Sequence, residues 1–389
     1  MNASSVCYLD NAATSFPKPE SVYNEVRRCL LSYCGNPGRS AHSLSLAAAN
    51  KIYDCRVAAA ELIGIDAPEN IAFVPSSTFG LNMIIKGLLK YGDHVIISNM
   101  EHNAVYRPIY KLAREGKISY DTFSVLDKEK KLSNDEICRN LETLIRKNTR
   151  LVICNHQSNV CSCALPACEI GRVCKKHGII FALDAAQSAG HCDINMQRDS
   201  IDILCAPGHK GLYGLQGSAF VAFGSSQIKL DTLIEGGNGI RSLDGDMPDL
   251  CPERYESGTL ATPCIAGLCE GIREIRRIGI PEIVGRESEL YSRLLEDLGA
   301  IRGINIYGSS HVGSTLLFNA AGYSSESLAA RLNDRGICVR GGFHCSALAH
   351  ASLGTETEGG VRVSLGIFNT KKDIDRLTVA VNDILKNKQ

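Results

Sequence analysis

Between residues 71 and 223 the sequence repeats one pattern, in which a short apolar run is followed by a longer segment of helical character. The predicted strands are IAFV (71–74), HVIIS (94–98), ISYDTFSV (118–125), LVICN (151–155), IIFALD (179–184), DILCA (202–206) and SAFVAF (218–223). Strands that are apolar at nearly every position are typical of a parallel sheet covered on both faces. The alternation therefore predicts an α/β domain with right-handed crossovers, whose ligands bind at the carboxyl ends of the strands.

Helices are predicted in the segments between these strands. They are TFGLNMIIKGLLK (78–90), the segment around RPIYKLARE (107–115), NDEICRNLETLIRK (134–147) and PACEIGRVCKKHG (166–178). In the last of them we expect Pro166 at the first helical position and Gly178 just beyond the end, because these residue types favour those two places.

After about residue 263 the pattern changes to longer helical stretches and shorter strands. The helical stretches are IAGLCEGIREIRRIG (265–279) and the segment around ELYSRLLEDLG (289–299), and the strands are STLLFN (314–319), ICVR (337–340) and GVRVSLG (360–366). This order predicts a smaller α+β domain. GTETEGG (354–360) is predicted to be a loop.

The charge balance and the cysteine content restrict the classes of function. Lys and Arg together number 42, as do Asp and Glu, so nothing in the net charge favours nucleic acid or an anionic membrane as a partner. We expect no secretory signal and no membrane span, because no basic segment precedes an apolar one at the start and no apolar run is long enough. The 17 cysteines then indicate a reduced, cytoplasmic protein. Four of them cluster without zinc-site spacing, so we expect no metal and assign them to the core: Cys161, Cys163, Cys168 and Cys174.

One lysine, Lys210, lies in the glycine-rich stretch CAPGHKGLYG (205–214). Glycines let a backbone turn sharply or approach a ligand closely, and a lysine among apolar neighbours can become a nucleophile. Asp184 ends the strand IIFALD, and Lys210 follows the next strand, so both side chains can reach one pocket. A strand-end carboxylate facing a lysine suits pyridoxal phosphate, because the lysine binds the cofactor and the acid keeps its ring nitrogen protonated.

The phosphate of such a cofactor needs an anion site. In PSSTFGLN (75–82), Ser77 and Thr78 lie at a predicted helix start, where free N–H groups and the helix dipole favour an anion. Taken alone, these residues are better explained as an ordinary helix cap.

The sequence resembles the class V aminotransferase group of fold-type I pyridoxal-phosphate enzymes, and within it the cysteine desulfurases. The resemblance extends over nearly the whole chain, through YLDNAATSFPKPESV, NPGRSAHSLS, FVPSSTFGLN, MEHNAVYRP, SNV, DAAQ, GHK, RYESGTLATP, VRGGFHC and VRVSLGIFNT. The VRGGFHC and VRVSLGIFNT segments are similar to the SUF-type branch. The resemblance implies a large cofactor-binding domain over residues 14–262 with a mostly parallel, seven-stranded sheet. It also implies a small α+β domain over residues 1–13 and 263–389, which carries the active-site cysteine.

Carried over by position, the resemblance implies a role for each site residue. Lys210 would hold the cofactor covalently and move the Cα proton of the substrate, and His102 would stack on the ring and assist proton transfer. Asp184 would pair with the ring nitrogen and Gln187 with the phenolic oxygen. The phosphate would be bound by Ser77, Thr78, His209 and, from a second subunit, Thr259. The substrate carboxylate would be bound by Asn159 and Arg362, with Arg340 nearby.

Among the cysteines, Cys345 in GGFHCSALAH (341–350) is the candidate nucleophile. A reactive thiolate needs partial exposure and local positive charge, which Arg340 and His344 could supply. In the family this position attacks the sulfur of the substrate and carries it as a persulfide. A buried structural thiol is the alternative, since that is the commonest setting for a cysteine.

Four positions depart from the family pattern. Pro207 stands where a serine is common and removes one phosphate donor, and Gly211 is an added glycine after the lysine. Cys161 and Cys163 lie where hydroxyl residues or glycine are usual, close to the expected pocket. These departures leave the choice of substrate open.

The resemblance thus implies a homodimeric, cytoplasmic L-cysteine desulfurase that produces alanine and an enzyme persulfide, which a sulfur-acceptor protein could then receive. Three alternatives stay open: a selenocysteine lyase or related C–S lyase on the same scaffold, an ordinary aminotransferase, and a non-catalytic sulfur or metal scaffold. An aminotransferase would leave Cys345 without a role.

Overall fold

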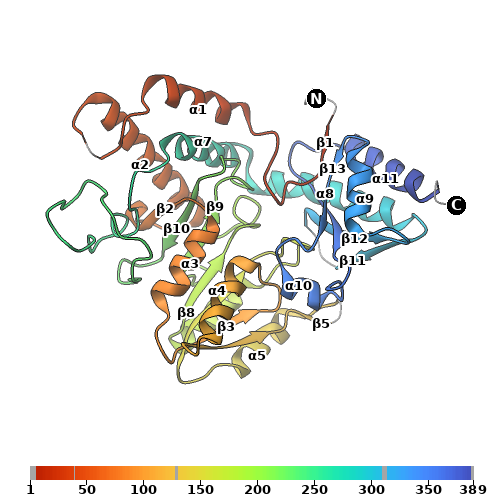
Figure 1. Cartoon of the computed structure of the whole chain (residues 1–389), viewed down its shortest axis with the longest axis horizontal. Coiled ribbons are helices and arrows are strands. Elements are labelled where there is room, and N and C mark those ends of the chain that lie inside the picture. Colours follow the sequence, from red (N-terminus) through yellow and green to blue (C-terminus); the bar gives the residue numbers. More distant parts are fainter. Residues whose placement is uncertain (1–5, 39, 128–129, 309–312, 387–389) are drawn as a thin grey trace.

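The computed structural model describes residues 6–386, apart from 39, 128–129 and 309–312. Its larger sheet has seven strands, and all seven predicted strands belong to it (Figure 1). In spatial order they are β2 (Ile71–Val74), β10 (Ala219–Phe223), β9 (Ile203–Pro207), β8 (Ile180–Asp184), β7 (Thr149–Asn155), β3 (His94–Ser98) and β4 (Ser119–Phe123). Only β10 runs antiparallel to its neighbours, so the predicted, mostly parallel α/β sheet is confirmed.

The apolar strand sequences follow from burial on both faces of this sheet. Every residue of β2, β3, β9 and β10 is buried, and alternate residues of a strand enter different cores. In β3, for example, Ile96 belongs to one core while Val95 and Ile97 belong to the other. The strand β4 lies at the edge and is only partly buried, and it is shorter than the predicted strand 118–125.

Helices cover both faces of the sheet. The predicted ones are α3 (Ser77–Leu88), α4 (Asn103–Arg114), α5 (Asn134–Thr143) and α6 (Ala167–His177). Pro166 is the N-cap of α6 and not its first helical residue, while Gly178 ends the helix at a φ of 65° as expected. Two N-terminal helices, α1 (Glu20–Ser32) and α2 (Ser43–Ile63), both pack against α7 (Thr262–Ile278). The short elements η2 (Pro68–Asn70), β5 (Leu126–Asp127) and β6 (Lys130–Lys131) complete this part.

The C-terminal part has an antiparallel sheet of its own. Its strands, in spatial order, are β11 (Ile304–Tyr307), β12 (Thr315–Ala320), β15 (Gly360–Ser364) and β14 (Arg340–Gly342). The helices are α8 (Ile280–Gly299), α9 (Ser325–Asn333), α10 (Ala347–Ser352) and α11 (Lys371–Lys386). The predicted strand 337–340 is divided, because β13 (Ile337–Cys338) pairs with the N-terminal strand β1 (Cys7–Tyr8) and β14 pairs with β15.

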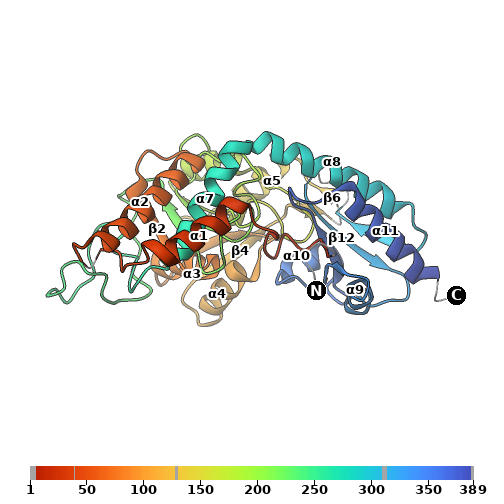
Figure 2. The same ribbon diagram turned by 90° about the horizontal axis from the view of Figure 1, so that it is seen from above.

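The helices α7 and α8 follow one another along the upper side of the molecule in Figure 2 and connect the two sheets. Because α7 packs on α1 and α2, it lies with the larger sheet. The division of the chain at residue 262 stays a prediction.

Residues 224–261, all of which are described, form no helix or strand. They extend outward beyond α2 in Figures 1 and 2, and we call them the arm. Large apolar side chains are exposed along it, namely Ile234, Ile240, Leu243 and Leu250. Within the described residues, no helix has the length and apolar character needed to cross a membrane.

Candidate active site

A cavity of about 110 Å³ lies at the carboxyl ends of β7, β8 and β9, the edge where ligands were expected. Eight of the predicted site residues line it: Ser77, Thr78, His102, Asn159, Asp184, Gln187, His209 and Lys210. The topology thus brings together residues that are far apart in the sequence.

Lys210 follows β9 and enters this cavity half-buried. Burial lowers the pKa of its amine to about 8, an effect that the Asp184 carboxylate opposes and that Arg362 and Arg340 reinforce. An amine with such a pKa exists partly in its neutral, nucleophilic form near neutral pH.

Asp184 is the last residue of β8, and its side chain is held in place by a hydrogen bond from Ala186 N to Oδ1 (2.9 Å). Burial raises the pKa of this carboxyl to about 6, although the Ala186 bond and Lys210 lower it. A cation placed next to Asp184 would therefore find a desolvated acceptor.

A second buried acid is Glu101. It accepts hydrogen bonds from Asn155 N and from the Ser98 hydroxyl, and burial raises its pKa to about 8.

His102 is the N-cap of α4, and its Nδ1 accepts the backbone N–H of Ala104 (3.0 Å). Burial, reinforced by Lys210 and Arg340, lowers the pKa of this imidazole to about 4. The ring is therefore neutral at pH 7, and its remaining proton is on Nε2.

The cavity wall nearest α3 has the features of an anion site. Ser76 caps the helix, so Ser77 and Thr78 lie in its first turn, where backbone N–H groups are free to bind an anion. Among the described residues, Ser77 Oγ and His209 Nδ1 are buried without a hydrogen-bond partner. Buried polar atoms seldom lack partners, so these two indicate a bound group. Together with Lys210 and Asp184, this set fits pyridoxal phosphate.

The glycines beside Lys210 are required for close approach and not for a left-handed backbone. A side chain at Gly208 would meet Ser218 Oγ at 2.2 Å, and one at Gly211 would meet Ala189 O at 2.4 Å. Neither glycine has a positive φ. The added glycine thus lets the segment that holds Lys210 pack tightly against the chain after β8.

Arg362, in β15, is 1% exposed and forms an ion pair with Asp10, with 2.6 Å between Nη2 and Oδ1. Its Nη1 donates to Asn159 O (3.1 Å). Within the described residues, its Nε is buried without a partner, so this guanidinium retains donor capacity for a carboxylate.

Cys345 lies in a strained turn. Phe343 O accepts the N–H of Ser346 (3.0 Å), and the two central residues have positive φ values, 51° for His344 and 57° for Cys345. Two positive values are typical of a type I′ turn, which usually contains asparagine and glycine. Left-handed backbone costs a residue with a side chain about 1–2 kcal/mol.

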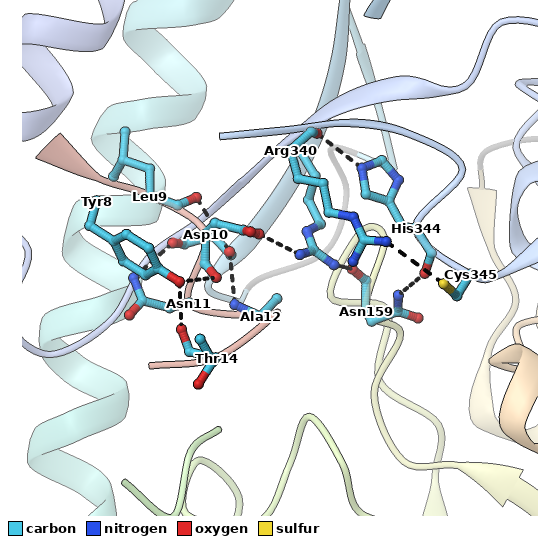
Figure 3. Close-up of polar contacts among 12 residues, drawn as sticks. Tyr8, Leu9, Asp10, Asn11, Ala12, Thr14, Asn159, Arg340, His344 and Cys345 are labelled. Carbon is cyan, nitrogen blue, oxygen red and sulfur yellow. Dashed lines mark hydrogen bonds and ion pairs between the residues drawn. The ribbon is translucent and has the colours of Figure 1, made fainter. Parts of the chain in front are cut away.

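Cys345 is exposed, and Arg340 Nη2 lies 3.7 Å from its Sγ (Figure 3). At this distance the guanidinium of Arg340 can donate to the sulfur. The side chain of Asn159 connects the turn to the cavity, because Nδ2 donates to His344 O (2.8 Å) and Oδ1 accepts from Ser346 Oγ (2.7 Å). Asn159, Arg340, His344 and Cys345 therefore gather at one place, as Figure 3 shows.

Cys161 and Cys163 are 1% and 0% exposed. Burial raises the pKa of Cys161 to about 11 and moves that of Cys163 in the same direction. Both thiols pack into a core, which disfavours a nucleophilic role. In the described part of the chain, no three His, Cys, Asp or Glu side chains gather as metal ligands.

Gln187 and Thr259 differ in their position relative to the cavity. Gln187 donates from Nε2 to Ala12 O (3.0 Å), which fixes its amide on the cavity wall. Thr259 does not line this cavity but is exposed on the arm, beside a second cavity of about 220 Å³.

The sequence reasoning did not identify Asp10, Glu101 and His350 as site residues. Asp10 forms an ion pair with Arg362, which lies 352 positions later in the sequence. Glu101 is buried and belongs to the MEHN segment. In the sequence, Glu101 is marked only by its place beside His102 in MEHN, and Asp10 only by the YLDN segment, which belongs to the family resemblance.

Comparison with known proteins supplies relatives for this arrangement. The family model described as aminotransferase class-V matches residues 7–377. A protein of Methanothermobacter thermautotrophicus named probable cysteine desulfurase is 31% identical, over 97% of this chain and 94% of its own length. A probable cysteine desulfurase of Pyrococcus abyssi is 29% identical, over 98% of this chain and 95% of its own length.

Solved structures agree with these relatives. The apo structure of a cysteine desulfurase from Thermococcus onnurineus NA1 is similar with a TM-score of 0.88 and 29% identity, covering 99% of this chain and 96% of that one. A cysteine desulfurase from Escherichia coli has a TM-score of 0.87 at 24% identity, with the same coverage, and shows likeness of fold alone.

Proposed function

Because the chain belongs to the aminotransferase class-V family, we propose that it is a pyridoxal phosphate-dependent cysteine desulfurase. It would convert L-cysteine to L-alanine and leave the sulfur on Cys345 as a persulfide. The observation that carries this proposal is the exposed Cys345 thiol beside Arg340, which Asn159 connects to the cavity of Lys210 and Asp184. The desulfurase names of the relatives at 31% and 29% identity support it.

The residues that would hold the cofactor follow from the cavity. Lys210 would bind it covalently, Asp184 would accept from its ring nitrogen, and Gln187 would lie beside the ring. Its phosphate would be bound by Ser77, Thr78 and His209, with Pro207 contributing only a wall of the cavity. When bound, pyridoxal phosphate supplies an electron sink that stabilises negative charge at the Cα of the substrate.

The other chemistry is performed by side chains of the chain. Arg362 would bind the substrate carboxylate through donors that Asp10 and Asn159 leave free. Lys210 would remove the Cα proton at Nζ, which its lowered pKa permits near neutral pH. The Cys345 thiolate would then attack the substrate sulfur, so that an S–S bond forms as the Cβ–S bond breaks. A proton added at Cβ, and a second one returned to Cα by Lys210, would complete alanine.

Incubation of the purified protein with pyridoxal phosphate and L-cysteine tests this function. We expect alanine and, in the presence of a thiol reductant, an equal amount of sulfide. Pyruvate in place of alanine would indicate a different C–S lyase. Absence of every product from a protein that holds its cofactor would reject the proposal.

The variant Asp184→Asn is expected to keep the fold and lower turnover on the order of 10³-fold, because the cofactor ring would lose its counter-charge. Turnover and bound cofactor are measured together. Asp202→Asn is the matched control, since this partly buried aspartate likewise accepts a backbone N–H, from Phe181 (2.8 Å), but does not line the cavity. Turnover of Asp184→Asn within about threefold of the unaltered protein, less than about 1 kcal/mol of barrier, would show that the cofactor is misplaced.

We further propose that the arm mediates a homodimer in which Thr259 of one subunit completes the phosphate site of the other. Its position outside the cavity of its own chain and the exposed apolar side chains of the arm support this arrangement. The variant Thr259→Val is expected to weaken cofactor binding about tenfold, since a hydrogen bond to a charged group is lost. Thr232→Val on the same arm is the control. A catalytically active monomer in sedimentation would contradict the proposal.

A cytoplasmic location and transfer of sulfur to an acceptor protein are further parts of the proposal. All 17 cysteines are unpaired, which is typical of a reducing compartment. Exposure of Cys345 would make its persulfide accessible to an acceptor. Fractionation of cells and pull-down after cysteine treatment test these two points.

A further inference from the structure

The turn that carries Cys345 needs support, because both of its central residues have positive φ. Backbone in this region persists only where the surrounding structure holds it. Asn159 holds the carbonyl of His344, and Asn103 N donates to Cys345 O (2.8 Å). Neither contact explains what holds the His344 side chain, which is 2% exposed.

A chain of hydrogen bonds runs from His344 away from the cavity. His344 Nε2 lies 3.1 Å from Arg340 O, and its Nδ1 lies 3.2 Å from His350 Nε2. His350 Nδ1 lies 2.7 Å from Thr355 Oγ1. The two imidazole planes are nearly parallel, with 5.4 Å between centroids and 17° between planes. The ring of His350 also meets that of Phe343, the first residue of the turn, edge to face at 5.6 Å between centroids.

The donor and acceptor roles in this series of hydrogen bonds follow from the chemistry of its groups. A backbone carbonyl only accepts, so His344 Nε2 is the donor to Arg340 O and the neutral ring accepts at Nδ1. His350 must then donate from Nε2, which leaves its Nδ1 to accept the hydroxyl proton of Thr355. With both imidazoles neutral, every donor in this chain of hydrogen bonds finds an acceptor.

Burial provides this neutral state. His350 is 1% exposed and Thr355 is 2% exposed. Burial lowers the pKa of His344 to about 3 and that of His350 to about 4, so neither ring is charged at neutral pH. The series of hydrogen bonds from Arg340 O to Thr355 is thus complete at neutral pH.

We propose that His350 and Thr355 are positioning residues for the Cys345 thiol, because their hydrogen-bond chain holds His344 in the strained turn and keeps Cys345 Sγ beside Arg340. Neither residue lines the cavity or contacts Cys345 Sγ. The consequence for the reaction rests on the proposed function, but the position of the thiol does not.

The variant Thr355→Val tests this proposal, since it removes the hydroxyl and keeps the shape. We expect kcat for L-cysteine to fall at least about tenfold and as much as 10²-fold, because small displacements of a reacting group have effects of this size. KM and bound cofactor should change less than threefold, because the cavity is untouched. Thr355→Ser keeps a hydroxyl and should restore most of the rate. Thr378→Val, on α11, is the control for loss of a hydroxyl from this part of the chain.

A second measurement does not depend on turnover. Trypsin releases residues 341–362 as a peptide in which Cys345 is the only cysteine, so its alkylation by iodoacetamide can be followed by mass spectrometry at pH 7. We expect alkylation of Cys345 to be at least about threefold slower in Thr355→Val, because the thiolate loses its place beside Arg340. In His350→Phe, which lacks both ring nitrogens, the decrease should be at least as large.

The outcomes separate the two proposals. Unchanged kcat and unchanged alkylation in folded Thr355→Val and His350→Phe would overturn the positioning role. A lower kcat with unchanged alkylation would overturn it too, since the effect would not act through the thiol. If the unaltered protein produced no alanine, the proposed function would fail, and the alkylation rates would still decide the positioning role.

Discussion

Replacing Lys210 with alanine is expected to eliminate turnover of L-cysteine, with a decrease of at least about 10⁴-fold. Two functions would be lost together, the covalent attachment of pyridoxal phosphate and the base that takes the Cα proton. The lowered pKa of this amine, to about 8, makes it suitable for both. Lys210→Arg keeps a cation but cannot attach the cofactor, and we expect it to be equally inactive.

Attachment itself is measured by borohydride reduction followed by peptide mapping. A competitor lies close by, because burial also lowers the pKa of Lys18 to about 8 and its Nζ donates to His209 O (2.7 Å). The reduced cofactor should map to Lys210 in the unaltered protein and be absent from Lys210→Ala. A label on Lys18, or any label that persists in the variant, would refute the assignment.

The variant Cys345→Ala should lower alanine formation from L-cysteine by at least about 10⁴-fold, which is an effect expected for loss of a nucleophile. Sulfur is a poor leaving group when a C–S bond is cleaved. Attack by the Cys345 thiolate helps, because the thiolate accepts the sulfur as the bond breaks. Selenium is bonded more weakly to carbon and is ionised at neutral pH, so it leaves with less help. Activity on selenocysteine should therefore be largely retained in the variant.

Cys34→Ala is the matched control, because Cys34 and Cys345 are the two exposed cysteines of the chain. After treatment with L-cysteine, the added sulfur should be found on the 341–362 peptide and not on the 151–172 peptide, which holds Cys161 and Cys163. If Cys345→Ala desulfurates cysteine at the normal rate, or if the persulfide maps to 151–172, the nucleophile lies elsewhere. Equal loss on both substrates would point to a role for Cys345 beyond sulfur transfer.

The sequence was most informative where burial is complete. The strands 71–74 and 94–98 have the predicted bounds, because an apolar run between polar residues marks a strand that is covered on both faces. The edge strand β4 was predicted too long, since an edge mixes polar and apolar residues and its ends are not marked. The helices α1 and α2 were not predicted; a mostly polar composition in the first and an alanine-rich one in the second weaken the helical periodicity.

Site residues could be predicted from the sequence where their immediate neighbours in the sequence marked them. Asp184 ends a predicted strand, and Lys210 and Cys345 lie close to glycines. Both settings can be recognised in the sequence alone. The roles of Asp10, His350 and Thr355 depend on partners that only the folded chain brings together, such as Arg362 for Asp10. The positive φ values of His344 and Cys345 could not be predicted, because residues other than glycine seldom adopt them.

The pairing of the N-terminal strand has a consequence for the order of events during synthesis. Cys7 and Tyr8 pair with Ile337 and Cys338, and Asp10 pairs with Arg362, which is synthesised 352 positions later. The sheet of seven strands is encoded by residue 223 and can form while translation continues, since domains generally fold as units on the nascent chain. The arginine that is proposed to receive the substrate can meet its counter-ion Asp10 only after it has itself left the ribosome. The nascent chain would thus be without a working catalytic centre until residue 362 has emerged.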